Sequence, residues 1–172
     1  WGIPTDKPIA DDFDGDGKVD VAVFRPQTGS WYIRNSSDQS IKIVNWGMNG
    51  DRPVASDYDG DGRSDLAVYR PSNGTWYIQK SGVEGTVSYQ LGTDSDQPVP
   101  ADFDGDRKTD VAIYRPSTGI WTILRSKDNS LRTVNFGTPG AKPVPSDFDG
   151  DGEADIAIWD PSDGTWYIDR SS

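Results

Sequence analysis

The stretch DFDGDGKVD at residues 12–20 decides the fold, because it returns three more times at a spacing of 45 residues. The later copies read DYDGDGRSD at 57–65, DFDGDRKTD at 102–110 and DFDGDGEAD at 147–155. Each copy places four aspartates within nine residues, and such closely spaced carboxylates repel one another unless a cation lies among them. Calcium is the natural candidate, since it accepts about six to eight oxygen ligands from a flexible loop.

The 45-residue period extends over the whole chain. Three other residue types keep the same spacing without a gap: Trp31, Trp76, Trp121 and Trp166; Gly2, Gly47, Gly92 and Gly137; and Pro26, Pro71, Pro116 and Pro161. A period of about 20–50 residues is typical of repeat architectures. We therefore expect a single repeat domain over residues 1–172, with units at approximately 2–46, 47–91, 92–136 and 137–172.

Each unit has the pattern of four short strands and no helical periodicity. In the first unit, strands are expected near Pro8–Phe13, at 20–25, at 31–35 and at 40–46, because these segments are rich in β-branched and aromatic residues. The segment PQTG at 26–29 separates the second strand from the third, and its pattern recurs in every unit. Proline sets the first corner of a turn and glycine accepts a positive φ at its end, so this segment predicts a hairpin.

Four antiparallel strands in 45 residues correspond to one blade of a β-propeller. The predicted fold class is therefore all-β, a propeller built from four four-stranded antiparallel blades, either closed by themselves or forming part of a larger ring. Trp31 and its equivalents are expected to fill the space between neighbouring sheets, and the alanines at 22, 67, 112 and 157 to lie in crowded strand interiors. The last blade lacks its outer strand, because it has no counterpart of residues 38–45.

Composition excludes several classes of function. The net charge of −11 argues against sequence-independent binding of nucleic acid, which needs a basic surface. Four bound calcium ions would bring this charge to −3, so most of it belongs to the repeated loops. The chain has no Cys and no His, which rules out disulfides, thiol chemistry and histidine acid–base catalysis. No segment has the pattern of a signal peptide or a membrane span.

The repeats resemble the FG-GAP and VCBS-type repeats of integrin-like calcium-binding β-propellers, and the resemblance covers the whole chain. The segment FGTPGAKP at 136–143 is similar to the FG…GAP segment of that family. The resemblance implies a calcium loop between the first two strands of each blade, with four aspartate side chains and one backbone carbonyl as ligands. The implied ligands are Asp12, Asp14, Asp16, Lys18 and Asp20; Asp57, Asp59, Asp61, Arg63 and Asp65; Asp102, Asp104, Asp106, Lys108 and Asp110; and Asp147, Asp149, Asp151, Glu153 and Asp155.

The third loop differs from the others at its bend. Gly17, Gly62 and Gly152 occupy a position where a positive φ is expected, and Arg107 takes that place in the third loop. A non-glycine residue in the left-handed region costs about 1 kcal/mol, and the arginine adds a charge that repels a cation. We therefore expect up to four calcium ions, with the third site the weakest. No glutamate follows at the twelfth loop position, which excludes a helix-flanked EF-hand.

A non-enzymatic, extracellular or cell-surface protein of bacterial type fits these features, because loops in extracellular modules bind calcium at about 10⁻⁴–10⁻³ M. The first hypothesis is adhesion or recognition, with a glycan or a protein as ligand. Tyrosines and tryptophans at the blade rims would stack on sugar rings, and Arg25, Arg70 and Arg115 are candidate polar contacts or, alternatively, structural partners of an acidic loop or an edge carbonyl. The last blade breaks this arginine pattern with Trp159-Asp160.

Two other functions remain open from the sequence. The chain is alternatively a subunit of an extracellular fibre, in which other copies supply a strand to the open edge of the last blade. A further alternative is that the chain is an accessory domain of a secreted polysaccharide-active enzyme. Catalysis by the chain itself is not expected, because the acids outside the loops, including Asp6, Asp51, Asp96 and Glu84, form no recognisable pair. Sequences at 35–37 and 73–75 match glycosylation sequons.

Overall fold

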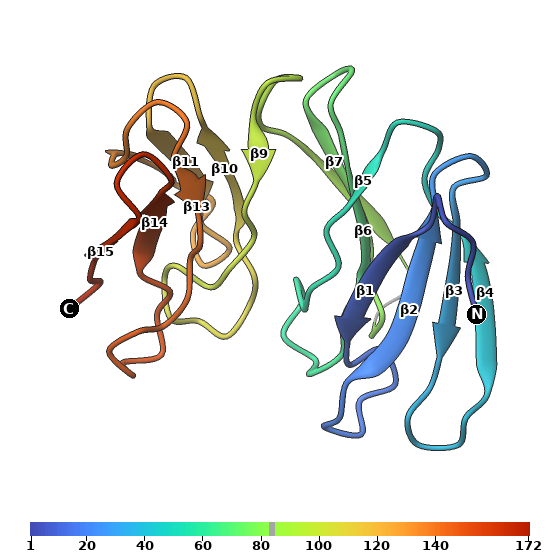
Figure 1. Cartoon of the computed structure of the whole chain (residues 1–172). Helices are drawn as coiled ribbons and strands as arrows, with labels where there is room; N and C mark the ends of the chain where they lie inside the picture. Colours follow the sequence, from blue (N-terminus) through green and yellow to red (C-terminus); the bar gives the residue numbers. More distant parts are fainter. Residues whose placement is uncertain (83–84) are drawn as a thin grey trace. The chain divides into compact units, whose positions relative to one another are not determined.

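The computed structural model describes residues 1–82 and 85–172, and all regular elements in this part of the chain are β-strands. Within these residues, no helix is long and apolar enough to cross a membrane. The strands form four antiparallel sheets, each joining strands that follow one another in the sequence (Figure 1). The chain divides into two compact units, residues 1–90 and 91–172, and each unit contains two sheets, called blades below.

Unit 1 contains blades 1 and 2. Blade 1 consists of β1 (Lys7–Asp11), β2 (Asp20–Arg25), β3 (Ser30–Arg34) and β4 (Ile41–Asn45), in that order across the sheet. Blade 2 has the same order and consists of β5 (Arg52–Pro53), β6 (Leu66–Arg70), β7 (Thr75–Gln79) and β8 (Thr86–Gln90).

Unit 2 contains blades 3 and 4. Blade 3 consists of β9 (Gln97–Pro98), β10 (Val111–Arg115), β11 (Ile120–Leu124) and β12 (Leu131–Asn135). Blade 4 has three strands, β13 (Lys142–Pro143), β14 (Ile156–Asp160) and β15 (Thr165–Asp169). The predicted all-β propeller class, with four antiparallel blades of which the last has three strands, is confirmed. One domain over the full length stays a prediction.

The repeated turn between the second and third strands is a hairpin, as the Pro–Gly spacing predicts. The Gly29 N–H donates to the Arg25 carbonyl at 2.9 Å, and Gly29 has a φ of 65°. A Cβ at this position would collide with the Gly47 carbonyl, so a larger residue would displace the chain that leaves the blade. Gly119 has a φ of 72° and meets Gly137 in the same way.

The core of unit 1 lies between its two blades and is centred on Trp31. One buried cluster is formed by Ala22, Phe24, Trp31, Ile33, Leu66 and Val68. The Trp31 ring packs against Phe24 with centroids 5.3 Å apart, and its Nε1–H donates to the Trp46 carbonyl at 2.8 Å. The indole is therefore buried with its one polar group satisfied.

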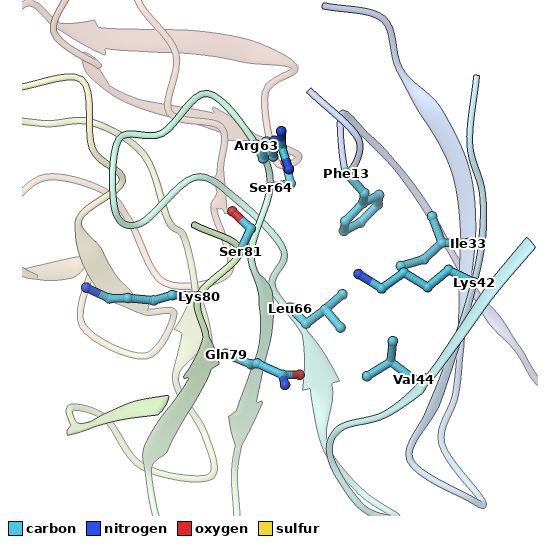
Figure 2. Close-up of a pocket in the computed structure, with 10 residues that line it drawn as sticks. All are labelled: Phe13, Ile33, Lys42, Val44, Arg63, Ser64, Leu66, Gln79, Lys80 and Ser81. Atoms are coloured by element: carbon cyan, nitrogen blue, oxygen red, sulfur yellow. The ribbon is translucent and has the colours of Figure 1, made fainter. Parts of the chain in front are cut away.

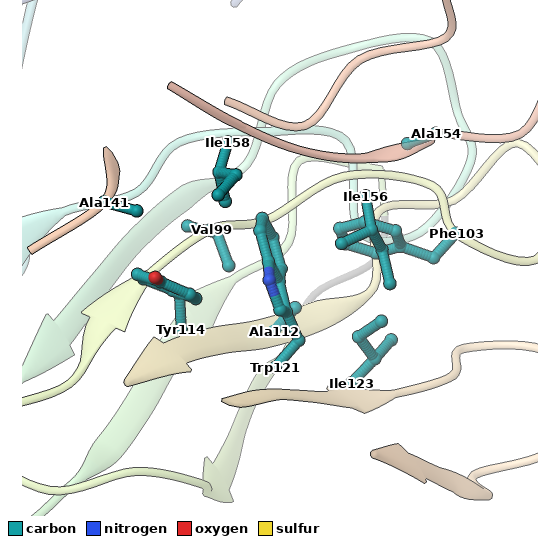
Figure 3. Close-up of a cluster of buried hydrophobic side chains, with 10 residues drawn as sticks. All are labelled: Val99, Phe103, Ala112, Tyr114, Trp121, Ile123, Ala141, Ala154, Ile156 and Ile158. Atoms are coloured by element: carbon teal, nitrogen blue, oxygen red, sulfur yellow. The ribbon is translucent and has the colours of Figure 1, made fainter. Parts of the chain in front are cut away.

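Unit 2 repeats this arrangement around Trp121. Figure 3 shows Trp121 at the centre of the buried cluster, with Tyr114 on one side and Phe103 and Ile156 on the other. Its ring centroid lies 5.1 Å from that of Tyr114, and its Nε1–H donates to the Phe136 carbonyl at 2.8 Å. The alanines predicted to lie in strand interiors are confirmed there: Ala22, Ala67, Ala112 and Ala157 are each at most 1% exposed.

The fourth tryptophan of the series is not in a core, and the prediction was wrong at this position. Trp166 is 53% exposed, whereas Trp31, Trp76 and Trp121 are fully buried. Trp31 and Trp121 pack against the next blade of their unit: Leu66 and Val68 belong to the Trp31 cluster, and Ile156 and Ile158 to the Trp121 cluster. Among the described residues, no further blade packs on this face of blade 4, so the equivalent ring is exposed.

The first strand of a blade is also shorter than the sequence predicts in three of the four cases. β1 makes five residue pairs with β2, whereas β5, β9 and β13 make two pairs each with their neighbours. An isolated bridge beyond each short strand continues the pairing, as between Ser56 and Asp65. Pro100 and Pro145 lack an N–H at the interruption in blades 3 and 4; blade 2, with Ala55 there, is interrupted all the same.

The contrast between Trp31 and Trp166 predicts different costs for the same substitution at equivalent positions. Trp31→Ala removes a fully buried ring and should lower the free energy of unfolding by about 3–5 kcal/mol. Trp166→Ala removes an exposed ring and should change it by less than about 1 kcal/mol. Denaturant titration of both variants measures the difference, and equal losses would contradict the assignment of Trp31 to the core.

Candidate metal centres and an aromatic pocket

The first aspartate of each loop fixes the bend of its own loop. The Oδ1 of Asp12 accepts the Gly15 N–H at 2.7 Å, and its Oδ2 accepts the Gly17 N–H at 2.8 Å. The equivalent bonds recur in the other loops from Asp57, Asp102 and Asp147. The local sequence therefore folds into one loop shape four times, because the same carboxylate satisfies two backbone donors of the bend.

The last aspartate of each loop is buried and joins the start of the loop to the segment after the third strand. The Oδ2 of Asp20 accepts the Phe13 N–H at 2.8 Å, and its Oδ1 accepts the Ser36 N–H at 2.6 Å. Asp65, Asp110 and Asp155 make the same two types of bond, and all four side chains are at most 1% exposed. A short segment after the third strand thus belongs to the site.

Sequence reasoning missed the serine in this segment. The Ser36 hydroxyl donates to Asp16 at 3.0 Å, and the equivalent hydroxyls donate to the third aspartate of the other loops. The four serines are Ser36, Ser81, Ser126 and Ser171. They are 45 residues apart, so the period that revealed the aspartates was also the signal for the serines.

The aspartates converge as a metal site requires. In each loop, three carboxylates place one oxygen each within 4.8 Å of the others. Oxygens bound to one calcium ion at about 2.3–2.6 Å can be no farther apart than about 5 Å, so the spacing fits. The groups are Asp12, Asp14 and Asp20; Asp57, Asp59 and Asp61; Asp102, Asp104 and Asp110; and Asp147, Asp149 and Asp155.

A further observation in the second loop points to a missing partner. The Oδ2 of Asp59 is buried and has no hydrogen-bond partner among the described residues. Its counterpart in the first loop accepts the Ser37 hydroxyl at 2.6 Å, but Gly82 replaces that serine. A buried carboxylate oxygen without a partner is costly, and a bound cation would satisfy it.

Burial also raises the pKa of the last aspartate in two of the loops. It raises the pKa of Asp65 to about 6, and the negative charge of Asp59 adds to this effect. Burial likewise raises the pKa of Asp110 to about 6, with Asp104 as the neighbouring charge. Both ionised carboxylates therefore lack sufficient positive charge nearby, and a divalent ion would favour the ionised form.

Not every predicted ligand is placed in these groups. All four third aspartates accept a serine hydroxyl, but of these only Asp61 belongs to a group. Of the last aspartates, Asp65 lies outside its group. Lys18, Arg63, Lys108 and Glu153 donate their N–H groups to the third aspartate of their loops. Their role as carbonyl ligands stays a prediction.

The loops of neighbouring blades are directly bonded within each unit. The Ser64 N–H, in the second loop, donates to the Asp12 carbonyl at 2.7 Å, and the Ala154 N–H donates to the Asp102 carbonyl at 2.6 Å. The Arg63 side chain lies against Gly15, where an added Cβ would come within 2.8 Å of its Nε. An ion that fixes one loop would therefore also fix its contact with the next blade.

The repeated arginines have structural partners, which the sequence left as one of two alternatives. Arg25 donates from Nε and Nη2 to the two carboxylate oxygens of Asp6, at 2.9 Å each. Arg70 pairs in this way with Asp51, and Arg115 with Asp96. The Arg25 hydrogen bond holds the pKa of Asp6 below its usual range. Three acids that formed no recognisable pair in the sequence thus have one, and Glu84 lies outside the described residues.

A pocket of about 160 Å³ lies between blades 1 and 2 beside one of these pairs. It is lined by Trp46, Gly47, Val68, Arg70 and Tyr77. The Arg70 guanidinium lies 4.3 Å from the centroid of the Tyr77 ring, and the Trp46 Nε1–H donates to the Tyr77 carbonyl at 3.2 Å. Asp51 holds Arg70 in place, so two aromatic rings and a cation are fixed around one small space.

Comparison with known proteins agrees with the repeats and the fold. A family model described as an FG-GAP-like repeat matches residues 12–68 and 57–113. Among solved structures, an Agrocybe aegerita lectin that specifically recognises non-reducing terminal N-acetylglucosamine is similar, with a TM-score of 0.65 and 18% sequence identity. The match covers 92% of this chain and 47% of the lectin chain, so the chain spans about half the length of that protein. No curated protein matches.

The bend of the third loop predicts a gain of stability from a single substitution. Arg107 has a φ of 68°, in the left-handed region where Gly17, Gly62 and Gly152 have φ values of 80° to 93°. Arg107→Gly should raise the free energy of unfolding without metal by up to about 1 kcal/mol and tighten calcium binding at this loop. Gly17→Arg, where nothing lies within 4 Å of an added Cβ, should do the reverse. Calorimetric calcium titration measures both variants, and unchanged affinity in both would refute the role of the bend.

Proposed function

The chain belongs to the FG-GAP-like repeat family, and on that premise we propose that it is a non-enzymatic, calcium-stabilised recognition module that binds a glycan outside the cell. The pocket formed by Trp46, Arg70 and Tyr77 carries this proposal. Fixed aromatic faces pack against the apolar face of a sugar ring, and a guanidinium donates to its hydroxyl groups. The similarity in fold to a lectin is consistent with this use.

The pocket is preorganised, which favours binding. Arg70 is held by the two hydrogen bonds that it donates to the buried Asp51 and by its position over Tyr77. The Asn73 amide donates to the Tyr77 hydroxyl at 3.0 Å and fixes the end of that ring. Little side-chain freedom is therefore lost when a ligand enters, and that loss is a main cost of association.

Calcium would act in this proposal by stabilising the loops. At about 1 mM calcium, a site with a Kd of about 0.1–1 mM contributes roughly 0.4–1.4 kcal/mol by mass action, or about 2–6 kcal/mol for four sites. This sum is comparable with the stability of a typical domain. Such affinities favour a location outside the cell, since free cytosolic calcium would leave these loops empty.

The proposal assigns no catalytic role to the loop aspartates or to the acids paired with arginine. His and Cys are absent from the sequence. Three aspartates of each loop belong to a candidate metal group, and Asp6, Asp51 and Asp96 are each paired with an arginine. A general acid or base needs a free titratable group within reach of the reacting atom.

Glycan binding is tested directly on a glycan array with 1 mM calcium and with EDTA. We expect binding of a defined set of glycans with calcium, loss of that binding in EDTA, and a reduction of about tenfold for Tyr77→Ala, because the variant removes one wall of the pocket. Tyr167→Ala is the matched control, since this equivalent tyrosine in blade 4 lies in an exposed strand beside Asp160 rather than an arginine. An array without any bound glycan would refute the proposal.

A second candidate function is assembly by strand sharing, and β15 favours it. All five residues of β15 are exposed, and within the described residues its outer edge pairs with no strand. Such an edge accepts a strand from another chain, so copies would associate head to tail. Light scattering at increasing concentration should show growing oligomers if this candidate is correct, and monomers throughout would remove it.

A further inference from the structure

A second pocket, called the basic pocket below, lies between blades 1 and 2 and has a volume of about 170 Å³. Figure 2 shows its apolar side chains, Phe13 and Ile33 from blade 1 and Leu66 from blade 2. The polar part is formed by Lys42, Arg63, Ser64, Gln79, Lys80 and Ser81. Among the described residues, no acidic side chain lines it, although the chain carries a net charge of −11.

Two cations of the basic pocket have no carboxylate partner. Lys42 extends from β4 into the space between the two blades (Figure 2), and Arg63 lies in the second loop. Among the described residues, no carboxylate lies within 4.0 Å of either side chain, whereas Arg25, Arg70 and Arg115 are all paired. Unpaired cations beside an apolar surface form a site for an anionic group.

Gln79 adds a hydrogen-bond acceptor that no group satisfies. Its Oε1 is buried and has no partner among the described residues. In Figure 2 the amide points from β7 toward Val44, into the space that Lys42 also enters. Leaving such an acceptor unpaired is unfavourable, so a ligand that donates a hydroxyl hydrogen bond here would bind more tightly.

We propose that the basic pocket binds an acidic sugar, a hexuronate residue within the glycan. The carboxylate would contact Lys42 and Arg63, a ring hydroxyl would donate to the Gln79 Oε1, and the ring would pack on Leu66 and Phe13. The volume suits one ring, since pockets for drug-sized ligands are larger, about 300–1,000 Å³.

This inference rests on the proposed glycan-binding function and specifies its ligand. Tyr77 of the aromatic pocket and Gln79 of the basic pocket lie two positions apart on β7 and therefore on the same face, about 7 Å apart along the strand. One oligosaccharide lying along β7 would contact both pockets. The aromatic pocket would then hold a sugar by its apolar face, and the basic pocket would select for the acid.

Unit 2 offers an internal control, because the equivalent positions differ in charge. Arg132 and Arg170 replace Lys42 and Lys80, but Glu153 replaces Arg63 and Asp169 replaces Gln79. The three cations and one neutral amide of unit 1 thus correspond to two cations and two acids. We expect no binding of an acidic sugar between blades 3 and 4.

The test compares two probes that differ in one group, methyl glucuronide and methyl glucoside, by NMR titration of the 172-residue chain in 1 mM calcium. We expect the glucuronide to bind about tenfold more tightly, with the difference reduced by added salt. Lys42→Glu should abolish the preference, whereas Arg132→Glu should leave it unchanged. Gln79→Glu, nearly the same shape, should weaken glucuronide binding, and matching thermal unfolding curves would show that each variant is folded.

Each other outcome overturns the inference in a distinguishable way. Equal affinity for the two probes would retain glycan binding and reject the acidic sugar. Inorganic sulfate that binds as tightly as the glucuronide, with the same dependence on Lys42, would show an anion site without sugar recognition. Absence of binding to both probes, together with an empty glycan array, would reject the proposed function as well.

Discussion

Each of the four loops depends on the packing of four aspartates into nine residues. The structure shows how much of the repulsion the protein itself relieves: backbone N–H groups and a serine hydroxyl surround the carboxylates of Asp12, Asp16 and Asp20. It also shows where that relief is incomplete. The Asp59 Oδ2 is buried without a partner, and burial raises the pKa of Asp65 and Asp110 to about 6. A divalent ion would supply the charge that these groups lack.

The same loops connect the chemistry of the site to the packing of the blades. The last aspartate is bonded both to the loop and to the segment after the third strand, as Asp20 is to Phe13 and Ser36. Within each unit, a backbone hydrogen bond then joins one loop to the next, from Ser64 to Asp12 and from Ala154 to Asp102. The interface between the blades, which holds both proposed ligand pockets in unit 1, lies next to these contacts.

The sequence predicted correctly the structural features that the repeats share. The aspartate loops, the hairpins at Pro26–Gly29 and its equivalents, the strand order and the buried Trp31 and Trp121 all follow from local chemistry repeated at one period. The repeat period gave a wrong prediction where the burial of a side chain depends on a neighbouring element. Trp166 matches Trp31 in sequence, but among the described residues no following blade packs against it as Leu66 and Val68 pack against Trp31, and it is exposed. Pairs such as Arg25 with Asp6 join residues 19 positions apart, so proximity in the sequence did not reveal them.

Differences between the repeats carry the proposed function. Blade 4 has Ala141 and Asp160 where the other blades have the aspartate–arginine pair, so it lacks that ion pair. The basic pocket of unit 1 becomes mixed in charge in unit 2 through Glu153 and Asp169. The shared positions therefore account for the scaffold, and under the proposed function the positions that differ would give one interface its selectivity.

The central claim is that divalent ions neutralise the loop aspartates and thereby hold the blades together. Calorimetric unfolding of the chain in EDTA and in 1 mM calcium tests it most directly. The account predicts a gain of about 2–6 kcal/mol with calcium, and each kcal/mol raises the melting temperature of a chain of this size by about 2–4 °C. A melting temperature that is the same in calcium and in chelator would contradict it.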